Sequence, residues 1–245
     1  MKKWISILLL LMLCTGICMN ASAEENTVIT FRGLPWGCSP AEAIQLLKDD
    51  LGEENLEVGT LRSSYFPYSI TTHGNKNKLN MPMLFCCITV NNCKAAGYDI
   101  RAINLYFHPK ISEDQQSFEL SENAASLWKA EYSLSMPETI SDNRVLINDM
   151  VGKLNSIYGE GDTEYVEWTS VSSSGKSTKS CRHHIWQDDE NRIDVCSQIQ
   201  GTMSVTYCQK SVFSTQTTIN EIIQKEKEAK LQPIENPLDS STDGL

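Results

Sequence analysis

Cysteine and histidine residues stand close together in the C-terminal half of the sequence, where Cys181, His183 and Cys196 are separated by short strand-like segments. Thiolate and imidazole are ligands that zinc prefers, and two thiols held together can form a disulfide instead. The chemistry open to these side chains depends on how the strands that carry them pair.

An acidic turn over residues 188–191 predicts a β-hairpin between these strands. With this turn, His184 faces Val195 and Trp186 faces Ile193 across the hairpin. Because side chains alternate along a strand, one face carries these residues and the other carries the cysteines. If the next strand continues the meander, the second face holds Cys181, His183, Cys196 and Cys208.

Distance decides between a disulfide and a metal at this face. Cys208 lies about four residues along the strand from Cys196, roughly 13 Å at a strand's rise, whereas zinc lies about 2.3 Å from its sulfur ligands. Cys181 and Cys196 are diagonal neighbours, which a one-residue bulge would bring opposite each other. We therefore expect a Cys181–Cys196 disulfide. Zinc binding by Cys181, His183 and Cys196 is the alternative, and the sequence favours no metal and no other cofactor.

Other motifs give no reaction. The sequence holds no Gly-x-Ser-x-Gly elbow, no His-Glu-x-x-His and no cysteine-nucleophile signature. The run that ends in Gly175 and Lys176 has Ser170 where a phosphate loop needs its first glycine. Cys86 and Cys87 are adjacent on a predicted strand and point to opposite faces, with one of them in the core. The sequence thus favours a non-catalytic protein, although a dispersed active site would not be visible in it.

Residues 1–23 have the pattern of a secretory signal peptide. Lys2 and Lys3 precede a short apolar run, and a small-x-small site predicts cleavage after Ala23. We therefore expect an exported protein, either secreted or held in the periplasm or cell envelope. No later segment is apolar enough to span a membrane. The formal net charge of −10 excludes nucleic acid as an expected partner, because phosphate backbones repel an acidic chain.

The chain after the leader divides into three parts. Residues 24–135 and 136–212 each contain a helix followed by strands in a meander, and residues 213–245 form a charged helix and a disordered tail. The expected fold is α+β, with two tandem helix-plus-antiparallel-sheet units and a C-terminal helix. Seven cysteines follow the leader, so at least one of them is left without a partner within the chain.

The first helix has a clear beginning and end. Ser39 predicts an N-cap with Glu42 completing a capping box, and Gly52 predicts the stop. Trp36, between Pro35 and a glycine, is expected to fold back as a plug between this helix and the sheet. If Trp36 is exposed instead, it becomes the first candidate for a binding contact.

Residues 127–134 alternate between apolar and polar side chains, which predicts a half-buried strand. In a regular strand, one face then carries Trp128, Ala130, Tyr132 and Leu134.

The run Phe-x-x-x-x-Trp-Gly-x-Ser-x-x-Glu-Ala over residues 31–43, followed by a helix that ends in Leu-Gly, resembles the opening of small exported bacterial domains of the BamE / beta-lactamase-inhibitor-like type. That resemblance implies a helical segment packed on an antiparallel sheet and a binding or scaffold role. It implies no catalytic residue, and the chain lacks the lipid-bearing cysteine of BamE. We expect a non-catalytic binding or scaffold module with a protein or cell-envelope partner. The alternative is a thiol- or metal-dependent protein that uses the cysteine and histidine cluster of the second predicted sheet.

Overall fold

A computed structural model of the chain describes residues 29–72, 75–135, 142–172, 175–197 and 202–231. The signal-peptide prediction and the predicted tail after residue 231 lie outside these ranges. Within them, no helix is both long enough and apolar enough to cross a membrane.

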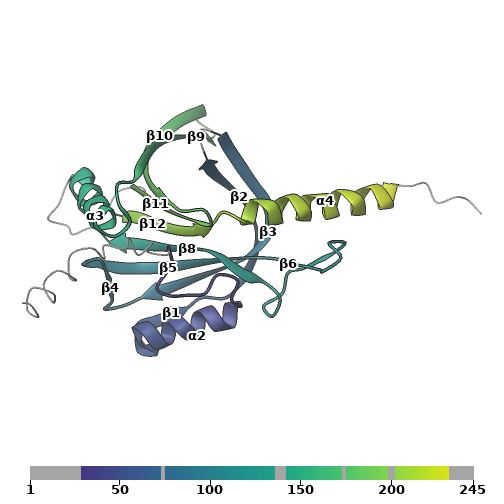
Figure 1. Ribbon diagram of the computed structural model, residues 1–245, viewed down its shortest axis with the longest axis horizontal. Coiled ribbons are helices and arrows are strands. Elements are labelled where there is room, and N and C mark those ends of the chain that lie inside the picture. Colours follow the sequence, from purple (N-terminus) through teal and green to yellow (C-terminus); the bar gives the residue numbers. More distant parts are fainter. Residues whose placement is uncertain (1–28, 73–74, 136–141, 173–174, 198–201, 232–245) are drawn as a thin grey trace, which may run out of the picture.

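The protein has an α+β fold built on a large antiparallel sheet (Figure 1). The helices are α2 (Pro40–Leu51), α3 (Asn143–Tyr158) and α4 (Val212–Leu231), with a short 3-10 turn η1 (Glu53–Asn55). The strands are β1 (Leu56–Val58), β2 (Arg62–Thr72), β3 (Asn75–Val90), β4 (Lys94–Ala95), β5 (Tyr98–His108), β6 (Lys110–Ile111), β7 (Phe118–Glu119), β8 (Ser126–Ser135), β9 (Asp162–Ser172), β10 (Gly175–Gln187), β11 (Asn191–Ser197) and β12 (Thr202–Gln209).

The main sheet runs in the order β1-β3-β5-β8-β12-β11-β10-β9, with β2 and β4 added beside β3 and β5. The pairing of β8 with β12 joins the two halves of the chain into one continuous sheet. In Figure 1, β9 and β10 at one end and β2 with part of β3 at the other rise on the same side of the central strands. The sheet is therefore curved, and α2 lies on the opposite side from these rising ends.

Both predicted helix boundaries of α2 are confirmed. The Ser39 hydroxyl accepts a hydrogen bond from the backbone N–H of Glu42, and Pro40 occupies the first turn, where its missing N–H costs nothing. Gly52 ends the helix with a φ of 86°, a conformation that a residue with a Cβ adopts only at a cost. Local sequence alone thus sets the length of this helix.

One face of the sheet carries the main hydrophobic core, which α2 and α3 cover. Leu47 of α2 and Leu154 of α3 are buried against sheet residues such as Ile103, Leu105 and Val195. The half-buried ring of Trp36 also packs against this core. At about 25 cal/mol per Å² of apolar area removed from water, this burial is the main force that holds both helices on the sheet.

The predicted alternation of residues 127–134 is wrong at Trp128. The ladder between β5 and β8 shifts register by one residue, so that Tyr106 pairs with Lys129 and Phe107 with Leu127. This β-bulge removes Trp128 from the main core, whereas Ala130, Tyr132 and Leu134 keep their predicted face. An extra residue in one strand changes the face of the side chains that precede it.

Trp128 belongs instead to a second cluster on the other face of the sheet, which α4 covers. Its fully buried ring packs with buried methionines of β3 and with apolar residues of α4. The members of this cluster are Met81, Met83, Trp128, Cys208, Val212 and Ile219. Among the residues whose side chains are described, the second face of the sheet carries this apolar cluster next to α4 and buried polar or charged side chains such as Glu131, Arg192 and Ser204 beyond it.

Candidate functional site

Cys181, His183 and Cys196 come together on this second face. One possible ligand atom from each residue, a sulfur or a ring nitrogen, lies within 4.8 Å of the other two. Cys181 and His183 are on β10, and His183 stands directly opposite Cys196 on β11. The face predicted from the alternation of side chains is thus confirmed. Cys208 pairs with Arg192 further along and is not a member of the group.

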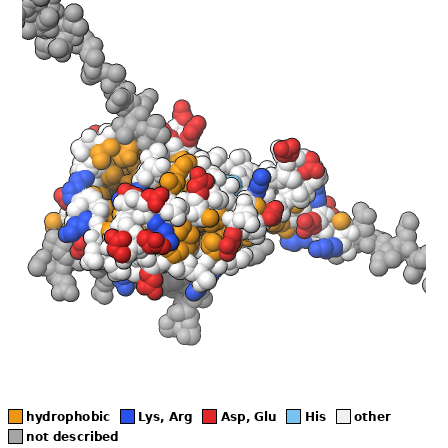
Figure 2. All heavy atoms as spheres, turned by 90° about the horizontal axis from the view of Figure 1, so that it is seen from below, with side chains coloured by type: hydrophobic (Ala, Val, Ile, Leu, Met, Phe, Trp, Pro, Cys, Tyr) orange, Lys and Arg blue, Asp and Glu red, His pale blue; other side chains and the backbone are white. Residues whose placement is uncertain are grey.

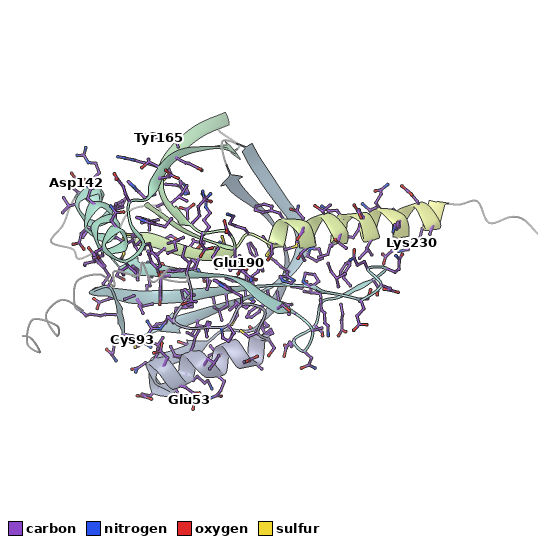
Figure 3. The ribbon with its side chains drawn as sticks, in the orientation of Figure 1. Glu53, Cys93, Asp142, Tyr165, Glu190 and Lys230 are labelled. Atoms are coloured by element: carbon purple, nitrogen blue, oxygen red, sulfur yellow. The ribbon has the colours of Figure 1, made fainter. Side chains whose placement is uncertain are left out.

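The predicted hairpin holds the cluster in place. Asp188 makes the turn, where its carboxylate accepts hydrogen bonds from the backbone N–H groups of Glu190 and Asn191 at 2.8 and 2.6 Å. On the other face, the indole N–H of buried Trp186 donates to Asn155 and to the carbonyl of Gly159, both at α3. In Figure 3 the label Tyr165 marks β9, which pairs with β10, and the label Glu190 marks the turn of the hairpin. Both sets of contacts lie at the turn end of the hairpin and fix the strand register there.

His183 is oriented by a carboxylate that the sequence reading did not assign to it. Its Nδ1 lies 2.7 Å from Oδ1 of Asp194. Burial lowers the pKa of His183, but the hydrogen bonds to Asp194 and Cys181 and their negative charge outweigh it and raise the pKa to about 9. Asp194 precedes Cys196 by two residues and so shares its face, which is the signal that identifies it in the sequence. The surroundings of His183 favour a positive charge.

A buried arginine completes this arrangement. The side chain of Arg192 is only 3% exposed. Its Nη2 lies 3.2 Å from Oδ2 of Asp194 and 3.6 Å from Oε2 of Glu164. Glu164 stands opposite His183 on β9, and its Oε2 is buried with no hydrogen-bond partner among the described residues. A charged group buried to this degree is tolerated only with opposite charges beside it.

The two cysteines are thiols in the structure. A hydrogen bond to Cys181 and, as a second cause, burial raise the pKa of the Cys196 thiol. This thiol therefore holds its proton in the absence of a competing cation. The ladder from His183 to Gln187 has no bulge, so Cys181 and Cys196 are diagonal neighbours and not an opposed pair. The disulfide between them remains a prediction.

The polar face continues across the sheet from β11 to β5. Ser204 stands opposite Cys196 on β12 and is 2% exposed, with no hydrogen-bond partner for its Oγ among the described residues. Beside it, Thr206 donates to Glu131 at 3.2 Å, and Lys129 lies 3.2 Å from the same carboxylate. The amine of Lys129 also lies 4.2 Å above the ring of Tyr106. Charged residues are thus buried and mutually compensated around the cluster.

Trp36 lies apart from the cluster. Its ring is half-buried against the main core near α2, and its Nε1 is buried without a hydrogen-bond partner in the described part of the chain. Trp36, which was expected to be a buried plug or, if exposed, a binding contact, is therefore only partly covered. Figure 2, a view from the side of α2, has acidic and basic side chains interspersed with apolar patches.

The cluster can coordinate a cation or exchange thiols, because it combines two thiols with an imidazole that a carboxylate orients. Its members come from two adjacent strands, and the orienting groups come from the same hairpin and from β9. Comparison of the chain with family models, with curated proteins and with solved structures found no match. Function must therefore be inferred from the geometry of this site.

Proposed function

We propose that the protein binds a thiophilic divalent cation, of which zinc is the type, through Cys181, His183 and Cys196. The observation that carries this proposal is the convergence of three ligand atoms within 4.8 Å of one another. Two sulfurs bound tetrahedrally at about 2.3 Å from zinc are about 3.8 Å apart. The two sulfurs therefore have to approach by at most about 1 Å, and each sulfur and the imidazole nitrogen by slightly more, because the Zn–N distance is shorter.

The orientation of His183 supports this proposal. Because Nδ1 is held by Asp194, Nε2 is the nitrogen left to bind the metal. A carboxylate that fixes the other ring nitrogen is the usual partner of a zinc-bound histidine. Two thiolates also balance the charge of a divalent cation. The nearby carboxylates of Asp194 and Glu164 are partly offset by the guanidinium of Arg192.

The strand register favours a metal over a disulfide for this cysteine pair. Diagonal neighbours on antiparallel strands have Cβ atoms up to about 7–8 Å apart, whereas a disulfide needs about 3.5–4.5 Å. A metal bridges the larger gap, because it adds about 2.3 Å on each side between the two sulfurs. Three protein ligands leave the fourth position of a tetrahedral ion to water or to another ligand.

We further propose that this site belongs to an exported, non-catalytic binding or scaffold module whose partner is a protein or a cell-envelope component. The leader over residues 1–23 and the resemblance of residues 31–43 to the BamE / beta-lactamase-inhibitor-like type support this role. We also propose that residues 24–135 and 136–212 are tandem helix-plus-meander units, because in each half a helix precedes an antiparallel run of strands.

The test is the metal content of protein recovered after export, together with zinc affinity measured by competition with a chromophoric chelator under reducing conditions. We expect one zinc per chain, and a fall in affinity of at least 100-fold in Cys181→Ser, His183→Ala and Cys196→Ser. Cys87→Ser is the matched control, because Cys87 is an exposed thiol of the same sheet and is outside the group. Unchanged affinity in all three cluster variants would refute the proposal.

A further inference from the structure

We propose that Ser204 is a positioning residue of the proposed metal site, and that its hydroxyl donates a hydrogen bond to the sulfur of Cys196 when that sulfur binds a cation. This inference rests on the proposed function and deepens it, because it adds a residue from a third strand to the three ligands. It concerns how strongly the site holds its cation.

The strand register places Ser204 beside one ligand of the site. Ser204 on β12 pairs directly with Cys196 on β11, and on its other side Cys196 pairs with His183 on β10. Residues directly opposite each other on antiparallel strands have Cβ atoms about 4.5–5.5 Å apart and point to the same face. A rotation between the staggered positions of the short Ser204 side chain can therefore aim its hydroxyl at the sulfur.

The hydroxyl of Ser204 is a buried polar group with no role in the fold of the sheet. The residue is 2% exposed, and its Oγ has no hydrogen-bond partner among the described residues. Its neighbour on the same face, Thr206, donates by contrast to Glu131 at 3.2 Å. A buried hydroxyl without a partner costs free energy, because the hydrogen bonds it makes to water in the unfolded chain are lost. A metal-bound sulfur on the adjacent strand supplies the missing acceptor.

A hydrogen bond to a metal-bound sulfur strengthens the site in two ways. A sulfur that coordinates a cation carries negative charge, so it accepts a hydrogen bond more strongly than a neutral group does. The bond also fixes the orientation of the ligand, and partners of this kind are worth about 10–100-fold in metal affinity. Asp194 has the corresponding place beside His183, at 2.7 Å from its Nδ1. Ser204 and Asp194 thus support two different ligands from two different strands.

The test uses the full chain, reduced and freed of metal, with zinc affinity measured by competition with a chromophoric chelator. Ser204→Ala should weaken zinc binding about tenfold. Its urea midpoint without metal should equal or exceed that of wild type, because the substitution removes an unpartnered buried hydroxyl. Ser204→Thr keeps the hydroxyl and should bind zinc within about threefold of wild type. Ser133→Ala is the matched control with unchanged affinity, because Ser133 pairs with Ser204 on β8, one strand further from Cys196.

Cobalt(II) in place of zinc gives a readout that a merely structural role would not change. The charge-transfer absorption band from sulfur to cobalt depends on the energy of the sulfur lone pairs, which a hydrogen bond lowers. Loss of this bond in Ser204→Ala should therefore move the band to longer wavelength. The band should stay in place in Ser133→Ala.

A Ser204→Ala protein with the zinc affinity and the cobalt spectrum of wild type would overturn the inference and leave the metal site standing. An equal loss of affinity in Ser204→Ala and Ser133→Ala would also overturn it, because such a loss would reflect a general loosening of the sheet. If wild type itself takes up no zinc, the proposed function fails and this inference fails with it. The wild-type measurement thus distinguishes the two failures.

Discussion

The ion pair between His183 and Asp194 should make the stability of the metal-free protein depend on pH in a way that one substitution removes. The pKa of His183 is raised from 6.5 to about 9 in the folded protein. Each pKa unit is worth about 1.4 kcal/mol, so protonation of His183 contributes up to about 3 kcal/mol to the free energy of unfolding. Because the folded pKa is the higher one, this contribution is complete below pH 6.5 and is lost as the pH rises through about 9.

The perturbation is His183→Gln, and the measurement is urea unfolding at pH 6 and pH 10 in the presence of a chelator and a thiol reductant. The substitution should cost up to about 3 kcal/mol more at pH 6 than at pH 10. Titration of groups that do not contact His183 affects both proteins alike and cancels in this double difference, whereas the coupling between His183 and Cys181 is part of the measured effect. The groups that face His183 are Cys181, Cys196, Asp194, Arg192 and Glu164, all of which are retained in the variant.

His184→Gln is the matched control, because His184 is adjacent in sequence but faces the main core. Burial and the charge of Arg182 lower its pKa below 6.5, so wild type loses stability from this residue as the pH falls. The two variants should therefore respond to pH in opposite directions. An equal cost of His183→Gln at pH 6 and pH 10 would refute the role assigned to Asp194.

Three further predictions concern the framework of the sheet. Trp128→Ala should lower the free energy of unfolding by about 3–5 kcal/mol in urea titrations, because the ring is fully buried under α4; a cost below 1 kcal/mol would contradict its place in the second cluster. Ser39→Ala should cost about 1 kcal/mol in the same assay through loss of the α2 cap, and Ser39→Gly clearly less. Iodoacetamide should alkylate Cys87 in the native protein and spare Cys86, which is fully buried on the other face; peptide mass spectrometry that finds equal labelling would contradict the predicted strand.

The hairpin that carries the cluster could be predicted from the sequence because its information is local. An Asp-rich turn sets the pairing of the two strands, and the strict alternation of side chains then decides which residues share a face. The face of Cys181, His183 and Cys196 follows from these two facts. The same locality explains the confirmed ends of α2, where Ser39 and Gly52 act within one helical turn.

The outcome at Trp128 had no such local signal. Residues 127–134 alternate regularly, and the bulge arises only where β8 pairs with β5. Its cause is therefore in the pairing of two strands far apart in sequence, and the side chain is accommodated because α4, from the end of the chain, covers it.

The sequence by itself determined the two ends of α2, the hairpin register and the face on which the two cysteines and the histidine lie. Only the tertiary structure decided that β8 and β12 join the halves into one sheet, and that Glu164 of β9 and the buried Arg192 lie beside the pair of His183 and Asp194. The physical reason is the range of the interactions. Capping, turns and alternation act between residues a few positions apart, whereas the charges around the cluster meet only after separate strands have paired and removed them from water.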